Sequence, residues 1–205
     1  KGRWYYLIST LMIIELMLPF FFRFESRKPQ ARELVILTVM AALASVSRVV
    51  FSFSPFLKTI TGIIMITGIA FGPEAGFLTG AVSAFASNFF FSQGPWTPWQ
   101  MFAMGCIGGL AGSLFSRRGR RPRKGMLCLF GFLAAVVLYG AVMNTASVLL
   151  WSHSLQWELI AAACAAGLPM DLLHGGSTAL LLYLLADPVQ GKLDRMREKY
   201  GWGRG

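Results

Sequence analysis

Charged and amide side chains interrupt long apolar stretches of this sequence, and these are the residues that could do chemistry. Asp171 and His174 are spaced i, i+3, so on a helix they share one face. Such a pair could form an internal hydrogen bond, contact a bound solute, or serve as acid and base. Arg48 is costly within an apolar helix, so we expect it to contact a ligand or an internal partner unless its guanidinium snorkels to the membrane surface.

Tryptophans and further polar groups gather towards one end of the expected helices. Four tryptophans lie at two connectors that are expected at the same membrane interface: Trp96, Trp99, Trp151 and Trp157. An aromatic belt at the membrane interface explains such a cluster, and so does a stacking cavity for a flat, ring-bearing solute. Asn88 stands near the end of a face of small residues, where its amide should find another helix or a solute. The predicted substrate-binding residues are Arg48, Phe51, Asn88, Trp96, Trp99, Gln100, Asn144, Trp151, Asp171 and His174.

The sequence carries no recognised motif for nucleotide hydrolysis or nucleophilic catalysis. It contains no GxxxxGK[ST] loop and no GxSxG turn. Cys106, Cys128 and Cys164 are isolated in apolar stretches, which favours buried packing over a metal site or a disulfide. We therefore expect a non-catalytic binder without a metal or cofactor of its own, which depends on energy from other subunits. An intramembrane enzyme that uses Asp171 and His174, and a structural membrane protein anchored by its tryptophans, are the alternatives.

Seven apolar stretches, separated by short connectors, must position these side chains. Hydrophobic residues make up 55% of the chain and charged residues only 14%, the reverse of the pattern in soluble domains. Most stretches approach the roughly 20 residues that a helix needs to cross a bilayer. We therefore predict an all-α, polytopic membrane helical bundle. The stretches are Trp4–Phe22, Leu34–Phe53, Phe56–Phe71, Gly76–Phe91, Trp99–Phe115, Met126–Trp151 and Trp157–Leu185.

Basic residues are concentrated on one side of this expected bundle. If every stretch crosses once, three segments face the same side of the membrane: the connector 23–32, the segment 117–124 and the tail beyond Gln190. Together they hold 15 of the 19 basic residues. The positive-inside rule places these segments in the cytoplasm, where they would touch anionic lipid or a partner protein rather than nucleic acid. The chain then divides into 1–30, an extra N-terminal hydrophobic helix with a basic connector, 31–195, a six-helix membrane core, and 196–205, a cytoplasmic tail.

Small residues recur at helical spacing in two places. Gly72, Gly76, Gly80 and Ala84 recur every four positions, which lets membrane helices approach closely. A second stripe, spaced i, i+3, i+4 and i+7, lies on one face of the stretch that starts at Leu34. This face could pack within the bundle or against a foreign helix. It consists of Thr38, Ala41, Ala42 and Ser45.

Four local motifs occur in a fixed order along the chain. They are Ala31-Arg32-Glu33-Leu34, Gly72-Pro73-Glu74-Ala75-Gly76, Gly94-Pro95-Trp96-Thr97-Pro98-Trp99 and Gly167-Leu168-Pro169-x-Asp171-x-x-His174. Together they resemble the substrate-binding S components of energy-coupling factor (ECF) vitamin transporters, across residues 31–195. The Trp- and Pro-rich connector is most similar to the cobalamin type of this family.

The resemblance implies a six-helix core in a prokaryotic cell membrane, with an outward-facing vitamin site in its outer half. It also implies assembly with a transmembrane scaffold subunit and two cytoplasmic ATPases that supply the ATP hydrolysis. The family's AxxxA face, which docks on the scaffold, corresponds here to Thr38, Ala41, Ala42 and Ser45. The expected solute is cobalamin or a related corrinoid, and riboflavin, folate, pantothenate or a queuosine precursor are the alternatives. The extra helix at Trp4–Phe22 departs from the six-helix plan.

Overall fold

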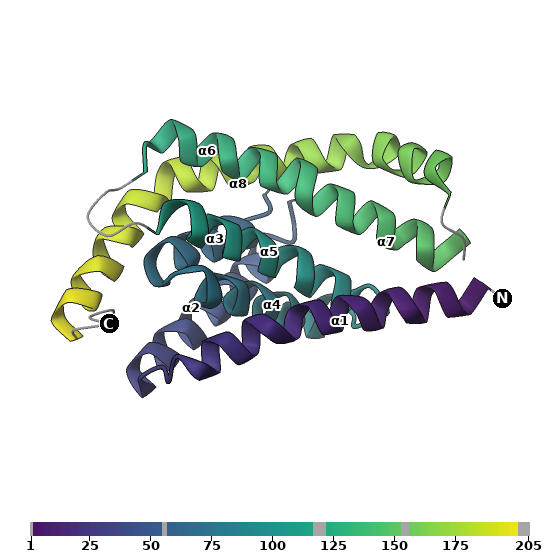
Figure 1. The fold of residues 1–205 in the computed structure, drawn as a ribbon. Coiled ribbons are helices and arrows are strands. Elements are labelled where there is room, and N and C mark those ends of the chain that lie inside the picture. The colour runs from purple at the N-terminus through teal and green to yellow at the C-terminus, as the bar shows by residue number, and fades with distance from the viewer. Residues whose placement is uncertain (1, 55–56, 117–121, 153–155, 201–205) are drawn as a thin grey trace.

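The computed structural model describes residues 2–54, 57–116, 122–152 and 156–200. Within these ranges the regular structure is helical, in agreement with the predicted all-α class (Figure 1). The elements are α1 (Gly2–Ser26), α2 (Ala31–Val50), α3 (Ile60–Phe71), α4 (Pro73–Phe91), α5 (Thr97–Phe115), α6 (Lys124–Leu133), the π-helical segment η1 (Ala134–Tyr139), α7 (Gly140–Ser152) and α8 (Trp157–Tyr200).

The predicted count of six core helices plus one is not matched. The stretch expected at Met126–Trp151 is divided by η1 into α6 and α7. Four helical segments are long and apolar enough to cross a membrane, and the described residues thus support a multi-pass membrane protein. These segments are Leu7–Ser26, Ala31–Val50, Lys124–Ser152 and Trp157–Met196.

Helix α3 is shorter than the stretch predicted at Phe56–Phe71. It begins at Ile60, so its 12 residues extend only about 18 Å, well under the hydrocarbon thickness of about 30 Å. All 12 residues are buried, including the hydroxyl-bearing Thr61 and Thr67. Helix α3 therefore lies inside the bundle and is too short to cross a membrane of that thickness.

Glycines bring α4 and α5 into direct backbone contact, as their spacing predicts. A Cβ atom added to Gly76 would lie 2.6 Å from the carbonyl carbon of Gly108, and one added to Gly108 would lie 2.7 Å from that of Gly76. Neither position can therefore carry a side chain without moving a helix. Gly72 has a φ of 97° between α3 and α4, where glycine is favoured. Helix α4 starts at Pro73, three residues before the stretch expected from Gly76, so only Gly72 separates it from α3.

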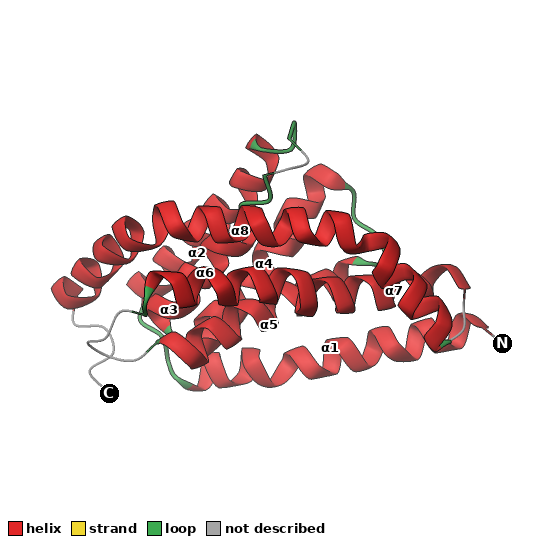
Figure 2. Cartoon of the chain, turned by 90° about the horizontal axis from the view of Figure 1, so that it is seen from above, coloured by secondary structure: helices red, strands yellow, loops and turns green. Residues whose placement is uncertain are grey.

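Helix α1 lies along one long edge of the bundle, and the loop between α2 and α3 lies at the opposite edge (Figure 2). The ring of Phe20 in α1 stacks on Phe77 of α4, with centroids 4.0 Å apart. Arg23, at the end of α1, pairs with Glu74 of α4 at 3.0 Å. The extra helix is therefore docked on α4 through both an apolar and an ionic contact.

The basic segments that the structure describes gather at one end of the molecule. The last turn of α1, the start of α6 and the C-terminal part of α8 are all found there (Figure 1). Lys124 of α6 pairs with Asp187 of α8 at 3.1 Å, and Arg27, just after α1, donates to the carbonyl oxygen of Phe71 at the end of α3. The predicted cluster at 117–121, His153 and Arg204 lie outside the described residues. The shared end agrees with the charge sorting expected from the sequence.

A buried polar network as the candidate functional site

Arg48 stands near the C-terminal end of α2, far from the basic segments, and side chains of α4 hold it there. Its Nη1 atom donates to Ser87 Oγ at 2.7 Å and to Asn88 Oδ1 at 2.8 Å, both on α4. The guanidinium also stands 4.6 Å from the centre of the Phe91 ring. Arg48 therefore has an internal partner, one of the outcomes that its cost in an apolar helix predicts.

Asn88 also forms hydrogen bonds with α5. It is only 1% exposed, and its Nδ2 atom donates to Gln100 Oε1 at 2.8 Å and to Thr97 Oγ1 at 3.2 Å. Gln100 in turn donates through Nε2 to the phenol oxygen of Tyr139 at 3.0 Å. The Arg48 guanidinium together with neutral amides and hydroxyls thus joins three helices and η1 in the interior of an apolar bundle.

Tyr139 meets His174 of α8, where the network continues to α3. The two rings pack edge to face with centroids 4.8 Å apart. His174 is 1% exposed, and its Nε2 atom lies 2.7 Å from Thr61 Oγ1. The other ring nitrogen, Nδ1, has no hydrogen-bond partner within the described residues. A buried nitrogen left unpaired in this way is unusual and is available to a ligand.

Asn144 and Asp171 form a separate pair between α7 and α8. Asn144 Nδ2 donates to Asp171 Oδ2 at 3.1 Å. Gly140 lies against the Asp171 carboxylate and Gly167 against the Asn144 amide, so glycines make room for both side chains. Asp171 and His174 therefore have different partners despite their shared spacing, and the acid–base pair that an intramembrane enzyme would need is not assembled by these contacts.

The connector before α3 is attached to α8 close to His174. The backbone N–H of Lys58 donates to Ser177 Oγ at 3.1 Å, and the Ser177 hydroxyl lies 3.3 Å from the Lys58 carbonyl oxygen. Burial lowers the pKa of the Lys58 ammonium, and the Asp171 carboxylate partly offsets this effect. The connector therefore brings a positive charge towards the half of the bundle that holds the polar network.

A model of the ECF-type riboflavin transporter S component family matches residues 28–190 of the chain. The chain belongs to this family. The match runs from the end of the α1–α2 connector into α8 and leaves α1 outside. Comparisons with curated proteins and with solved structures gave no match. The predicted membership among S components is confirmed, whereas the cobalamin type is not what the family model names.

As a family of transporter subunits, S components are non-catalytic, which agrees with the expectation that this chain is no enzyme. Among the described residues, no group of three or more His, Cys, Asp or Glu side chains is arranged to hold a metal ion. The candidate site of this S component consists of hydrogen-bonding groups. Such groups can recognise a solute by the positions of its own donors and acceptors.

The aromatic residues predicted to bind substrate in this S component do not join the network. Trp99 is buried, but it packs on Ile13 of α1 and on Ala146 and Leu149 of α7, and its Nε1 has no partner among the described residues. Trp96 is 37% exposed and Trp151 78% exposed. Phe51 contacts Phe53, with ring centroids 6.4 Å apart, rather than any network residue.

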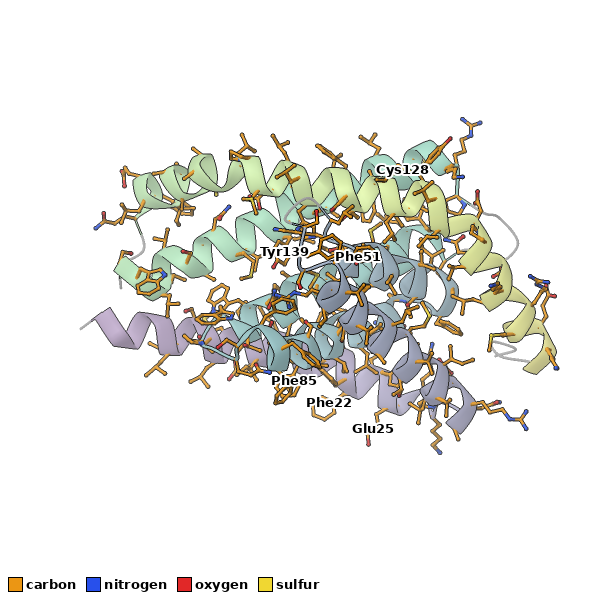
Figure 3. All side chains as sticks on the ribbon, turned by 180° about the vertical axis from the view of Figure 1, so that it is seen from behind. Phe22, Glu25, Phe51, Phe85, Cys128 and Tyr139 are labelled. Carbon is orange, nitrogen blue, oxygen red and sulfur yellow. The ribbon has the colours of Figure 1, made fainter. Side chains whose placement is uncertain are left out.

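The sequence did not single out Tyr139, Ser87 and Thr61 as site residues. Figure 3 labels Tyr139 and Phe51, which both lie over the middle of the molecule rather than at its tips. Ser87 and Thr61 are common residue types inside membrane helices, so neither carries a sequence signal. Tyr139 is the last residue of η1, and a π-helical turn shifts the register of a helix, so its direction could not be inferred from a regular helical spacing.

The small-residue face predicted to dock on the scaffold is divided in the structure. Ala41 and Ser45 are buried within the bundle, and Ser45 Oγ lies 3.2 Å from the carbonyl oxygen of Ser83 on α4. Thr38 and Ala42 are exposed on the outer side of α2. Their exposed neighbours are Leu34, Val35, Val39, Leu43 and Val46. Of the four predicted residues, only Thr38 and Ala42 stay accessible to a partner.

Proposed function

We propose that this S component captures a vitamin outside the cell and passes it to partner subunits for ATP-driven uptake. The observation that carries this proposal is the polar network from Arg48 through Asn88, Gln100 and Tyr139 to His174. Polar groups within a membrane bundle are costly, and they often mark the path or the site of a transported solute. The partners are a transmembrane scaffold and two ATPases, which membership in an ECF family implies.

The orientation of the site supports capture from outside. Arg48, Asn88 and Gln100 lie near the ends of α2, α4 and α5 that are far from the basic segments. If the basic end lies in the cytoplasm, as the positive-inside rule proposes, these residues are in the outer half of the membrane. A solute that arrives from the medium would then reach the network first.

Riboflavin is the first candidate for the solute, because the matching family is described by this vitamin. Its flat ring system carries carbonyl oxygens and ring nitrogens, which suit amide and hydroxyl partners. Cobalamin is the second candidate, since the connector from Gly94 to Trp99 is most similar to the cobalamin type. The placement of Trp151 and Trp99 does not support an aromatic stacking cavity at the network.

A binding titration tests vitamin capture directly. The purified protein in detergent is titrated with riboflavin and separately with cobalamin, and heat is measured in each titration. We expect one of the two to bind with a micromolar or lower Kd. Asn88→Leu should weaken that binding at least about 10-fold, because it removes a central hydrogen-bonding group. Trp151→Ala is the matched control and should leave Kd unchanged. If riboflavin, cobalamin, folate and pantothenate all fail to bind, the proposal is contradicted.

An uptake assay tests the dependence on partner subunits. A bacterial strain that requires the bound vitamin is supplied with this chain, the scaffold and both ATPases. Growth on low vitamin concentrations should need all of these proteins. Growth that persists with inactive ATPases would show that the chain does not act as an S component.

A further inference from the structure

Arg48 can only donate hydrogen bonds, and this has a consequence for the amide it touches. A guanidinium has five N–H groups and no acceptor. The atom of Asn88 that faces Arg48 must therefore be the oxygen, as the 2.8 Å contact with Oδ1 shows. The NH₂ group of Asn88 then points away from α2 and towards α5. Arg48 thus sets the orientation of an amide that would otherwise be free to turn over.

The same constraint is transmitted to Gln100. The NH₂ group of Asn88 donates to Gln100 Oε1 at 2.8 Å, so the Gln100 oxygen is turned towards α4. Its own NH₂ group must then face the other way, where it donates to Tyr139 at 3.0 Å. Each amide in this series accepts on one side and donates on the other, and the direction is set by the cation at its start.

Tyr139 is the last member of the series, and its hydroxyl proton is not donated to any of these side chains. Its phenol oxygen already accepts from Gln100, which leaves its O–H free to donate. No acceptor for that proton is found among the residues that the structure describes. The ring that Tyr139 contacts belongs to His174, whose buried Nδ1 atom is also unpaired. An unpaired ring nitrogen and a hydroxyl that accepts a hydrogen bond without donating one therefore occur on adjoining rings.

We propose that Arg48, Asn88, Gln100 and Tyr139 form a hydrogen-bond series with a fixed direction, and that Tyr139 donates its hydroxyl proton to an acceptor on the vitamin. This inference rests on the proposed function, because it assigns a role within the vitamin site. It defines the substrate class: the part of the solute that reaches Tyr139 must present a hydrogen-bond acceptor, such as a carbonyl oxygen or an unprotonated ring nitrogen. Arg48 acts as a positioning residue, since it sets the direction of the series through its contact with Asn88.

The direction of the series can be tested without any ligand. The protein is labelled with ¹³C at the ζ carbon of tyrosine, and the Tyr139 resonance is identified by its loss in Tyr139→Phe. Arg48→Gln replaces an obligatory donor by an amide that can face either way, and Asn88→Leu interrupts the series while it keeps the charge of Arg48, which also acts on Tyr139. The Tyr139 resonance should shift in both variants, although residues 48 and 139 have no direct hydrogen bond. Arg48→Lys retains an obligatory donor and should leave the resonance close to its wild-type position.

Equal effects of Arg48→Lys and Arg48→Gln on this resonance, or no effect of either, would contradict a fixed direction. If Arg48→Gln does not give folded protein, Gln100→Met supplies a second test. Met has a similar size and no N–H group, so the Tyr139 resonance must move when its donor is lost. An unchanged resonance in Gln100→Met would overturn the last link of the series.

A double-mutant cycle tests the contact with the vitamin. Tyr139→Phe should raise the Kd of the bound vitamin about 3- to 10-fold, the loss expected for one neutral hydrogen bond. In the Arg48→Gln background the same substitution should have a smaller effect, because the phenol is no longer held as a donor. Effects of Tyr139→Phe that are absent, or that are identical in both backgrounds, would contradict the proposal. If the wild-type protein binds no vitamin, vitamin capture is wrong, and the resonance experiment still decides the direction of the series.

Discussion

Two regions of this molecule are built from glycine-rich helices, but their glycines meet different partners. In α3, α4 and α5 most glycines face backbone, although Gly62 and Gly105 face side chains; a Cβ on Gly80 would lie 2.6 Å from the carbonyl carbon of Met104. In α6, α7 and α8 the glycines with close neighbours face mainly side chains, as Gly140 faces Asp171 and Gly131 faces Leu182. A backbone cannot move out of the way without moving its helix, whereas a side chain can rotate. The first region is therefore expected to be the more rigid of the two.

The polar network joins these two regions. Arg48 on α2, Asn88, Gln100 and Thr61 stand on or beside the first region, and Tyr139 and His174 stand on the second. A solute that contacts Tyr139 would thus bind where these two regions meet. Its contacts would depend on how α6, α7 and α8 are placed relative to α3, α4 and α5. The difference in packing indicates which side of the site can adjust when a solute binds.

The largest effect is expected where two backbones touch. Gly108→Ala places a Cβ against the Gly76 carbonyl group and the Ile64 side chain, so α4 and α5 must separate. We expect a loss of about 3 kcal/mol or more in stability, because overpacking here cannot be relieved by one side chain. Thermal unfolding in detergent measures it. Gly125→Ala is the control, since nothing lies within 4 Å of its added Cβ. Similar stability of the two variants would remove the basis of the comparison.

A smaller loss is expected where the two regions are joined. Asn88→Leu leaves Arg48 with Ser87 alone and takes the donor from Gln100 Oε1. Buried groups left without partners cost about 1–3 kcal/mol, so we expect a loss of about 2 kcal/mol in the unfolding free energy. Denaturant unfolding of the detergent-solubilised protein checks this value. An unchanged midpoint would indicate that solvent or lipid replaces the amide.

A still smaller effect is expected in the side-chain-packed region. Gly140→Ala brings a Cβ to 2.6 Å from Asp171 Oδ2, and the carboxylate can rotate to relieve the contact. The cost should be about 1 kcal/mol, mainly the hydrogen bond from Asn144 to Asp171. The comparison is sharpened by measuring Gly140→Ala beside Asn144→Ala, which removes the same bond directly. A loss as large as that of Gly108→Ala would show that α7 and α8 are as rigid as α4 and α5.

The smallest effect is expected at the predicted site residue that faces outward. Trp151 is 78% exposed at the end of α7, so Trp151→Phe should change the stability by no more than about 0.5 kcal/mol. Vitamin affinity should also stay within error of the wild type. A loss of affinity in this variant would show that Trp151 turns inward when a solute binds, and it would restore the stacking cavity considered from the sequence.

The sequence predicted the features that depend on spacing and composition. The glycines spaced by four residues do bring α4 and α5 together, and Arg48 and Asn88 do find polar partners inside the bundle. Trp99 was predicted to bind substrate, but its ring packs on α1 and α7 instead of joining the network. A residue number places a side chain along a helix, but its direction depends on how each helix is rotated against its neighbours.

The amino-acid sequence alone determined that this protein is a helical membrane protein of an S-component family with its basic segments at one end, because hydropathy, charge and local motifs are properties of the chain itself. Only the tertiary structure decided that Tyr139 ends the hydrogen-bond series, that Ala41 and Ser45 are buried, and that Asp171 and His174 have separate partners. These outcomes depend on the π-helical turn before Gly140 and on the rotation of each helix about its axis. Both are determined by packing between segments that lie far apart in the sequence.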